Sequence, residues 1–136
     1  MRGLRLTATA LLLLCAALPA TADPAEILDR WYDALMQPDR AVLAALLDED
    51  ATITLEDLDI DQTRDEFIES MDEWEDAVKG ASEQHRLDST VGDTVTMLVC
   101  YRFPENELLM RESFTFAGER IARSMQATVA EDCSAF

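Results

Sequence analysis

Three polar side chains interrupt apolar patterns in the second half of the chain. Glu112 lies between Met110 and Phe114 in one alternating segment, Arg123 lies in the next, and His85 is the only histidine. Every second side chain of a strand points to the same side, so the alternation predicts that Glu112 faces the core. A lone buried carboxylate costs several kcal/mol, and Glu112 is therefore expected to be protonated, paired or hydrated.

Two interpretations of Glu112, His85 and Arg123 are open. In the functional one, Glu112 is a general acid or hydrogen-bond donor with a raised pKa, His85 is its proton partner, and Arg123 orients an anionic group. In the structural one, Glu112 and Arg123 form an ion pair and His85 is a partly exposed residue at the start of a strand. Pairing Phe116 with Ile121 across a hairpin brings Arg123 within diagonal reach of Glu112.

These residues lie on four predicted strands at about residues 84–91, 95–103, 108–116 and 121–129, with turns at Gly92 and Gly118 between them. A further short strand is predicted at Thr52–Leu55. The inward faces are expected to carry Val95, Met97, Val99, Tyr101 and Phe103 on the second strand, Leu108, Met110, Glu112, Phe114 and Phe116 on the third, and Ile121, Arg123, Met125, Ala127 and Val129 on the fourth.

Three helices are predicted before the strands. Asp23 is a suitable N-cap for the first helix, which has Pro24 at its first position. The second helix begins after Pro38. Thr63 and Glu66 form the capping-box pattern that opens the third. Helices followed by an antiparallel meander indicate an α+β domain in which the helices cover one face of the sheet.

In this order of segments, the chain resembles the nuclear transport factor 2-like superfamily, with its SnoaL-like and steroid-isomerase branches. The matching stretches are RWYDAL (30–35), PDRAVLAALLDEDATI (38–53), TRDEFIESM (63–71) and FTFAGERIAR (114–123). The resemblance covers nearly all of residues 23–136. It implies a cone-shaped α+β barrel, with the N-terminal helices packed in the concave face of a curved antiparallel sheet and a pocket at the open end.

The resemblance also gives expectations for the pocket. It places Trp31 at the position of the oxyanion-hole tyrosine, Leu55 at that of the general-base aspartate, and Glu112 at that of the protonated carboxyl donor. Tyr32 is one residue further on, about 100° around the helix, so it is not expected to replace the family tyrosine. Without a base near the substrate, proton abstraction by the steroid-isomerase mechanism is not expected. We expect the ligand-binding residues to be Trp31, Tyr32, Leu55, Tyr101, Phe114 and Met125.

The first 22 residues have the pattern of a cleavable signal peptide. Arg2 and Arg5 precede an apolar run, and Ala20 and Ala22 supply the small residues of a cleavage site. The run is shorter than the roughly 20 apolar residues of a membrane helix. The sequence therefore predicts a periplasmic or secreted domain, residues 23–136, that does not contact a membrane after cleavage.

The chain is strongly acidic, with a formal net charge of −17. Like charge repels nucleic acid and anionic membranes, so neither is an expected partner. Asp57, Asp59 and Asp61 alternate like calcium ligands, but Gln62 and Ile68 stand where the turn glycine and the bidentate glutamate of such a loop belong. This segment is interpreted as a solvated connector, and no metal or cofactor is expected.

The mature chain would hold Cys100 and Cys133, because Cys15 leaves with the signal peptide. A disulfide is plausible in an oxidising compartment, but it requires α-carbons within about 7 Å, so the sequence leaves the bond open.

The function expected from these features is binding of a small apolar or weakly anionic ligand, or of a protein partner, in the cone pocket. One alternative is an isomerase, dehydratase or hydrolase that uses Glu112 with His85 and Arg123. A second is an interaction module that forms a homodimer through an exposed sheet face containing Leu98 and Cys100.

Overall fold

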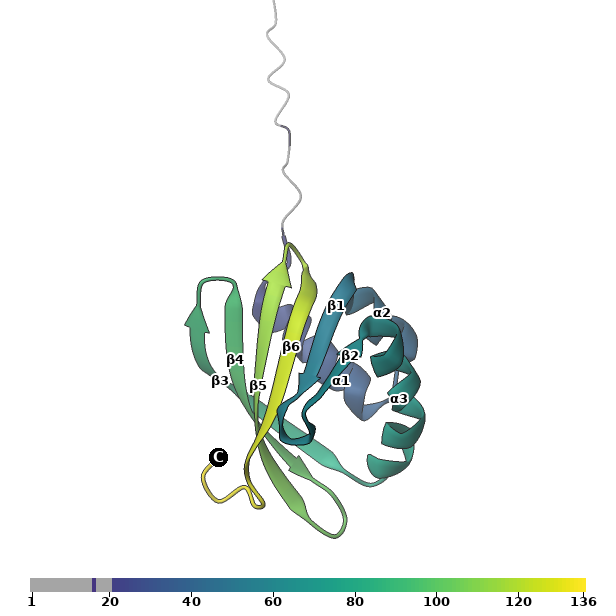
Figure 1. The fold of residues 1–136 in the computed structure, drawn as a ribbon. Coiled ribbons are helices and arrows are strands. Elements are labelled where there is room, and N and C mark those ends of the chain that lie inside the picture. Colours follow the sequence, from purple (N-terminus) through teal and green to yellow (C-terminus); the bar gives the residue numbers. More distant parts are fainter. Residues whose placement is uncertain (1–15, 17–20) are drawn as a thin grey trace, which may run out of the picture.

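The computed structural model describes Ala16 and residues 21–136, whose arrangement is shown in Figure 1. The predicted signal peptide lies almost wholly outside the described residues, as does Cys15, so the expected cleavage stays a prediction. None of the described helices is long and apolar enough to cross a membrane.

The helices begin where their capping residues predict. The Asp23 carboxylate accepts a hydrogen bond from the backbone N–H of Ala25, and Asp39 accepts one from Val42. At the third helix, the Thr63 and Glu66 side chains each accept a hydrogen bond from the other's backbone N–H. These bonds satisfy N–H groups that the first turn of a helix leaves free. The helices are α1 (Pro24–Met36), α2 (Arg40–Leu46) and α3 (Arg64–Ala77).

The strands form one curved sheet in the order β2-β1-β6-β5-β4-β3. Neighbouring strands are antiparallel except β1 and β6, which run parallel, so the sheet is mixed rather than wholly antiparallel. The expected α+β fold is otherwise confirmed. The strands are β1 (Leu47–Leu55), β2 (Ile60–Thr63), β3 (Ser82–Val91), β4 (Thr94–Arg102), β5 (Glu107–Ala117) and β6 (Arg120–Ala130).

The acidic segment after β1 is more ordered than a solvated connector. A short 3-10 turn (Glu56–Leu58) leads into β2, which pairs with β1. The Asp57 carboxylate accepts a hydrogen bond from the backbone of Thr128, and Asp61 accepts one from the Thr54 hydroxyl. Asp57 therefore ties this hairpin to β6, and Asp61 joins the two strands of the hairpin.

The helices cover the concave face of the sheet, as Figure 1 shows. The predicted alternation holds on β4 and β5: Val99 and Phe114 are fully buried there in one core with Trp31 of α1. Burial of these large apolar side chains is the main favourable term in forming such a core. Tyr32 of α1 bonds Glu112 and Trp31 packs against Phe114, so α1 lies over β5 at Glu112.

The predicted inward face of β6 is wrong beyond Ile121. Phe116 pairs with Ile121 as expected, but Arg123 then lies opposite Thr115, because Ala122 is an extra residue in β6. Such a bulge reverses the alternation. Arg123 and Met125 are therefore exposed, with Met125 at 42%, whereas Ser124 is fully buried. The expected Glu112–Arg123 ion pair does not form.

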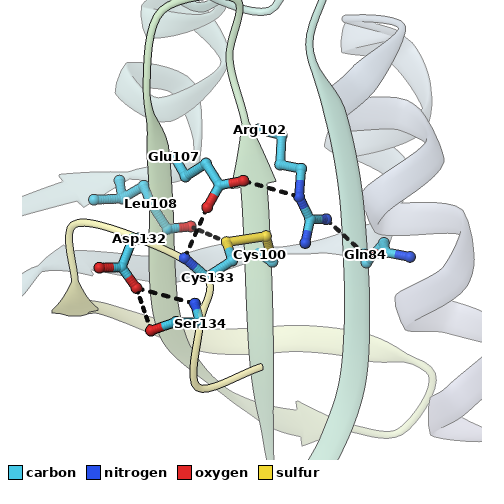
Figure 2. Close-up of polar contacts among 8 residues, drawn as sticks. All are labelled: Gln84, Cys100, Arg102, Glu107, Leu108, Asp132, Cys133 and Ser134. Atoms are coloured by element: carbon cyan, nitrogen blue, oxygen red, sulfur yellow. Dashed lines mark hydrogen bonds and ion pairs between the residues drawn. A yellow bond between two sulfur atoms is a disulfide. The ribbon is translucent and has the colours of Figure 1, made fainter.

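Part of the outer face of the sheet, around Leu98, Cys100 and Leu109, is covered by the C-terminal tail, residues 131–136. Cys133 of the tail forms a disulfide with Cys100 of β4, with the α-carbons 5.7 Å apart. Figure 2 shows the Glu107 carboxylate beside this bond, where it accepts a hydrogen bond from the Cys133 backbone N–H and pairs with Arg102. Leu98 and Cys100, expected on an exposed dimer face, are 5% and 0% exposed because the tail covers them.

Candidate functional site

Glu112 occupies the centre of the concave face. Its side chain is 1% exposed, and it is the one buried acidic residue among those described. The Tyr32 hydroxyl of α1 donates a hydrogen bond of 2.9 Å to Glu112 Oε2, and the Tyr101 hydroxyl of β4 donates one of 3.0 Å to Oε1. The two phenols hold the carboxyl group between the helix and the neighbouring strand.

This environment shifts the titration of all three groups. Burial raises the pKa of Glu112 from 4.5 to about 7, although the hydrogen bonds from Tyr32 and Tyr101 favour the carboxylate. Burial and the nearby Glu112 charge raise the pKa of Tyr32 and Tyr101 well above 10, so both stay donors at neutral pH. Glu112 can therefore exist in either charge state near neutral pH.

A cavity of about 500 Å³ opens between α3 and the sheet and ends at Glu112 and Tyr101. Its lining is mainly apolar. The α3 wall includes Phe67, Met71 and Trp74, and the sheet contributes Leu55 and Met110 among others. Sites for small organic molecules usually combine an apolar lining with a few polar groups that fix orientation.

His85 lies behind Tyr32 and outside the lining of this cavity. Its ring stacks on the Tyr32 ring with centroids 4.3 Å apart. Nδ1 is 2.6 Å from Glu83 and Nε2 is 2.8 Å from Asp29. These hydrogen bonds, above all that to Glu83, raise the pKa of His85 from 6.5 to about 9. His85 is a cation at neutral pH, so the expected role of proton partner to Glu112 does not fit its position or charge.

Comparison with protein-family models gives no match, and neither does comparison with curated protein sequences. Solved structures do match. IdmH, a proposed polyketide cyclase from Streptomyces antibioticus, gives a TM-score of 0.70 at 15% identity over 79% of this chain and 93% of that one. An NTF-2 like protein of unknown function from Burkholderia xenovorans gives a TM-score of 0.67 at 13% identity, over 80% of this chain and 83% of that one. The chain has the nuclear transport factor 2-like fold.

A third protein of this fold is a hypothetical protein with a ketosteroid isomerase-like fold from Catenulispora acidiphila, solved in complex with trimethylamine. It gives a TM-score of 0.66 at 17% identity, over 81% of this chain and 90% of that one. The resemblance inferred from the sequence is thus confirmed at the level of the nuclear transport factor 2-like fold.

The residues expected to line the pocket of this fold are only partly brought together. Leu55 and Tyr101 line the cavity. Phe114 packs edge-on against Tyr32 and Trp31 in the core below. Trp31, at the position of the family tyrosine, stacks on Phe67 in the core, with centroids 5.4 Å apart, and lies outside the cavity lining.

Tyr32 was not expected to replace the family tyrosine, yet its hydroxyl reaches the buried carboxyl group of Glu112. The helical rotation of about 100° between neighbours is real, but the buried face of α1 is wide enough to include both Trp31 and Tyr32. Trp31 packs toward α3, and Tyr32 points at Glu112. A wide buried face allows neighbouring residues to make different contacts.

Other lining residues were missed. Gln126 pairs with Glu112 across β5 and β6 and lines the cavity, because the bulge at Ala122 turns it inward. Gln62 lines it from β2, which was interpreted as a connector. Ser70 and Trp74 line it from α3, and the spacing of Trp74 from Phe67 is that of two residues on one face of a helix.

The site is suited to binding and to proton exchange. Glu112 can accept a hydrogen bond as a carboxylate or donate one as an acid. Across the described residues, no group of three or more histidine, cysteine or acidic side chains is arranged to hold a metal ion. The chemistry available at the inner end of the cavity is that of Glu112 and the phenols that hold it.

Proposed function

We propose that this domain binds a small, mainly apolar molecule in the cavity beneath α3, with a polar group of the ligand at Glu112. The supporting observation is the position of one buried carboxyl group at the inner end of an otherwise largely apolar cavity of about 500 Å³. This volume lies within the range usual for small-molecule sites. The apolar walls would supply affinity, and Glu112 would fix the orientation of the ligand.

The weakly anionic ligand expected from the sequence is less well supported. Arg123, which was to orient the anion, is exposed and separated from Glu112 by the reversal in β6. The ionisable carboxyl side chains in the cavity lining are Glu73 and Glu112. An anion would meet like charge at the inner end.

The trimethylamine complex of the Catenulispora acidiphila protein adds support for a small ligand, because it has the same fold. At 17% identity that likeness concerns the fold, so the chemical nature of the ligand has to be argued from the cavity of this chain.

A cavity-filling substitution tests the proposal. Ser70 lies in the α3 wall, where its hydroxyl bonds the Phe67 carbonyl of its own helix. Ser70→Leu is expected to abolish binding of N-phenylnaphthylamine, a neutral dye that brightens in apolar surroundings. Ser70→Ala, which loses the same hydroxyl but adds no volume, is the control and should bind like the original protein. Equal binding by all three proteins, or no binding by the original, would overturn the proposal.

A second candidate function is proton-transfer catalysis by Glu112, as in an isomerase or cyclase. It is favoured by the raised pKa of Glu112, about 7, since a group that titrates near the working pH serves best as acid or base. NMR detection of deuterium uptake at the α-carbon of small cyclic ketones in D₂O tests it. Catalysed uptake that Glu112→Gln abolishes while dye binding persists would establish this function, and uptake at the uncatalysed rate would exclude it for those ketones.

We also propose that the domain works outside the cytoplasm, in the periplasm or the medium. The signal pattern of residues 1–22 and the Cys100–Cys133 disulfide support this, because disulfides persist in oxidising compartments. The intact mass of the exported protein should correspond to a chain that begins at Asp23 with one disulfide. A mass that retains residues 1–22 would contradict cleavage.

A further inference from the structure

The carboxyl group of Glu112 lacks an ionic partner in the part of the chain that the structure describes. None of the ion pairs there includes it. The imidazolium of His85 lies on the far side of the Tyr32 ring and is already shared between Glu83 and Asp29. When Glu112 ionises, two phenol hydrogen bonds stabilise its charge and the charge of His85 lowers its pKa through space, but no cation among the described residues contacts it.

Glu112 also has unused hydrogen-bonding capacity toward the cavity. Each of its oxygens accepts one tyrosine hydroxyl, and a carboxylate oxygen can accept more than one hydrogen bond. Glu112 lines the cavity together with Tyr101. A charged group of a ligand at the inner end would therefore lie against this carboxylate and away from bulk water.

One wall beside Glu112 is aromatic. Tyr101 and Phe103 stack with centroids 6.1 Å apart, and the Trp74 ring stands edge-on to both, at 5.9 Å and 6.1 Å. All three rings line the cavity. Aromatic rings attract alkylammonium groups through their faces, and this attraction is strongest where water is excluded.

The mouth of the cavity, like its inner end, carries negative charge and would favour a cation. Glu73, exposed on α3, is part of the lining, and the chain as a whole carries a formal charge of −17. A field of this sign attracts cations to a cleft and repels anions from it.

We propose that the ligand of this cavity is an apolar amine, with its ammonium group against Glu112 and its hydrocarbon part along the α3 wall. This inference rests on the proposed small-molecule function and specifies its chemical class. The ammonium supplies the positive charge that the buried carboxylate lacks, and the aromatic rings replace part of its hydration.

Two probes of equal shape and different charge, together with an aromatic anion, test the inference on the protein with its disulfide intact. Benzyltrimethylammonium carries a permanent charge, neopentylbenzene is its uncharged carbon counterpart, and phenylacetate is an aromatic anion. Each is titrated against bound N-phenylnaphthylamine at pH 8. The ammonium probe is expected to bind roughly tenfold or more tightly than neopentylbenzene, and phenylacetate is expected to be the weakest.

Two substitutions locate the preference. Glu112→Gln should remove most of the tenfold difference while neopentylbenzene binds as before. Glu73→Gln, at the exposed mouth, should reduce it slightly, and it gives a second test if Glu112→Gln fails to fold. Glu69→Gln, exposed on the outer side of α3, should leave the difference unchanged.

The outcomes separate this inference from the proposed function. If neopentylbenzene displaces the dye as well as or better than benzyltrimethylammonium, the amine inference is wrong and the apolar cavity site stands. If the ammonium preference is unchanged in Glu112→Gln, the amine inference is also wrong, because the charge is then recognised elsewhere. If the dye does not bind the original protein at all, both proposals fail.

Discussion

On the concave face of the sheet, α1 and α3 cover the strands but leave a cavity of about 500 Å³ at Glu112, whereas on the outer face the C-terminal tail lies directly on the strands. The outer cover is a short segment fixed by the Cys100–Cys133 disulfide. The inner cover consists of helices, and a cavity remains between α3 and the sheet. The comparison indicates that the tail serves stability, while the space beneath α3 is available for a ligand.

Loss of the disulfide should have the largest effect and should act on stability alone. The bond closes a loop of 33 residues in sequence separation, and such a constraint contributes about 3 to 4 kcal/mol. Cys133→Ser should lower the free energy of unfolding in urea by about this amount and leave the affinity for N-phenylnaphthylamine unchanged.

The control for this prediction is reductant, which should bring the original protein to the stability of Cys133→Ser and leave the variant as it is. A large loss of dye affinity in the variant would show that the two faces are coupled, against the comparison.

Ionisation of Glu112 should be the next largest effect, on the concave face. Its pKa is raised in the folded state from 4.5 to about 7, so the folded protein binds this proton more tightly than the unfolded chain. The stability it confers is complete below pH 4.5 and is lost as pH rises to about 7. The loss is about 3 kcal/mol.

Urea unfolding at a series of pH values measures this loss. Glu112→Gln should remove this part of the pH dependence, and Glu69→Gln should retain it. Parallel curves for Glu112→Gln and the original protein would show that Glu112 does not titrate as its burial requires.

His85 should have a smaller effect in a higher pH range. Its pKa is raised from 6.5 to about 9 by Glu83 and Asp29, so its contribution to stability is complete below pH 6.5 and is lost as pH rises to about 9. Partial solvent contact of the ring reduces the size of this contribution.

Unfolding curves of His85→Gln should lack the pH dependence between about pH 6.5 and 9 that the original protein shows. The pH dependence due to Glu112 should persist and move only slightly upward, because the charge of His85 is the smallest of the influences on that pKa. If His85→Gln instead lost the pH dependence assigned to Glu112, His85 would govern the titration of Glu112 through Tyr32.

The smallest effects separate the two sides of β6. Arg123→Ala, on the exposed side, should change stability by no more than about 0.5 kcal/mol and leave dye affinity unchanged. Gln126→Ala, on the cavity side, should change dye affinity several-fold with a similarly small change in stability. Reversed effects on dye binding would place Arg123 in the site and contradict the bulge at Ala122.

Much of the fold was predictable because it depends on local patterns. Caps such as Asp23 and Thr63 mark helix starts through bonds within one turn, and strict alternation placed Glu112 and Tyr101 on the inner face. The order of the segments then indicated the fold.

The errors have physical causes that lie outside any short segment. A bulge in β6 adds one residue, so Ser124 instead of Arg123 lies on the inner face. The alternation of apolar residues in the sequence shows no break at this point. Whether Trp31 or Tyr32 contacts Glu112 depends on the angle at which α1 crosses the sheet. The positions of these two residues around the helix axis do not determine that angle. The cover over Leu98 depends on the path of the tail.

The central claim, that Glu112 is a buried titrating group at the end of a ligand cavity, is tested most directly by carbon-13 NMR of its carboxyl group, assigned with Glu112→Gln. The expected midpoint is about pH 7, with a clear change in both midpoint and chemical shift when benzyltrimethylammonium or N-phenylnaphthylamine is bound. A midpoint near the ordinary value of 4.5, unaffected by either probe, would contradict the claim.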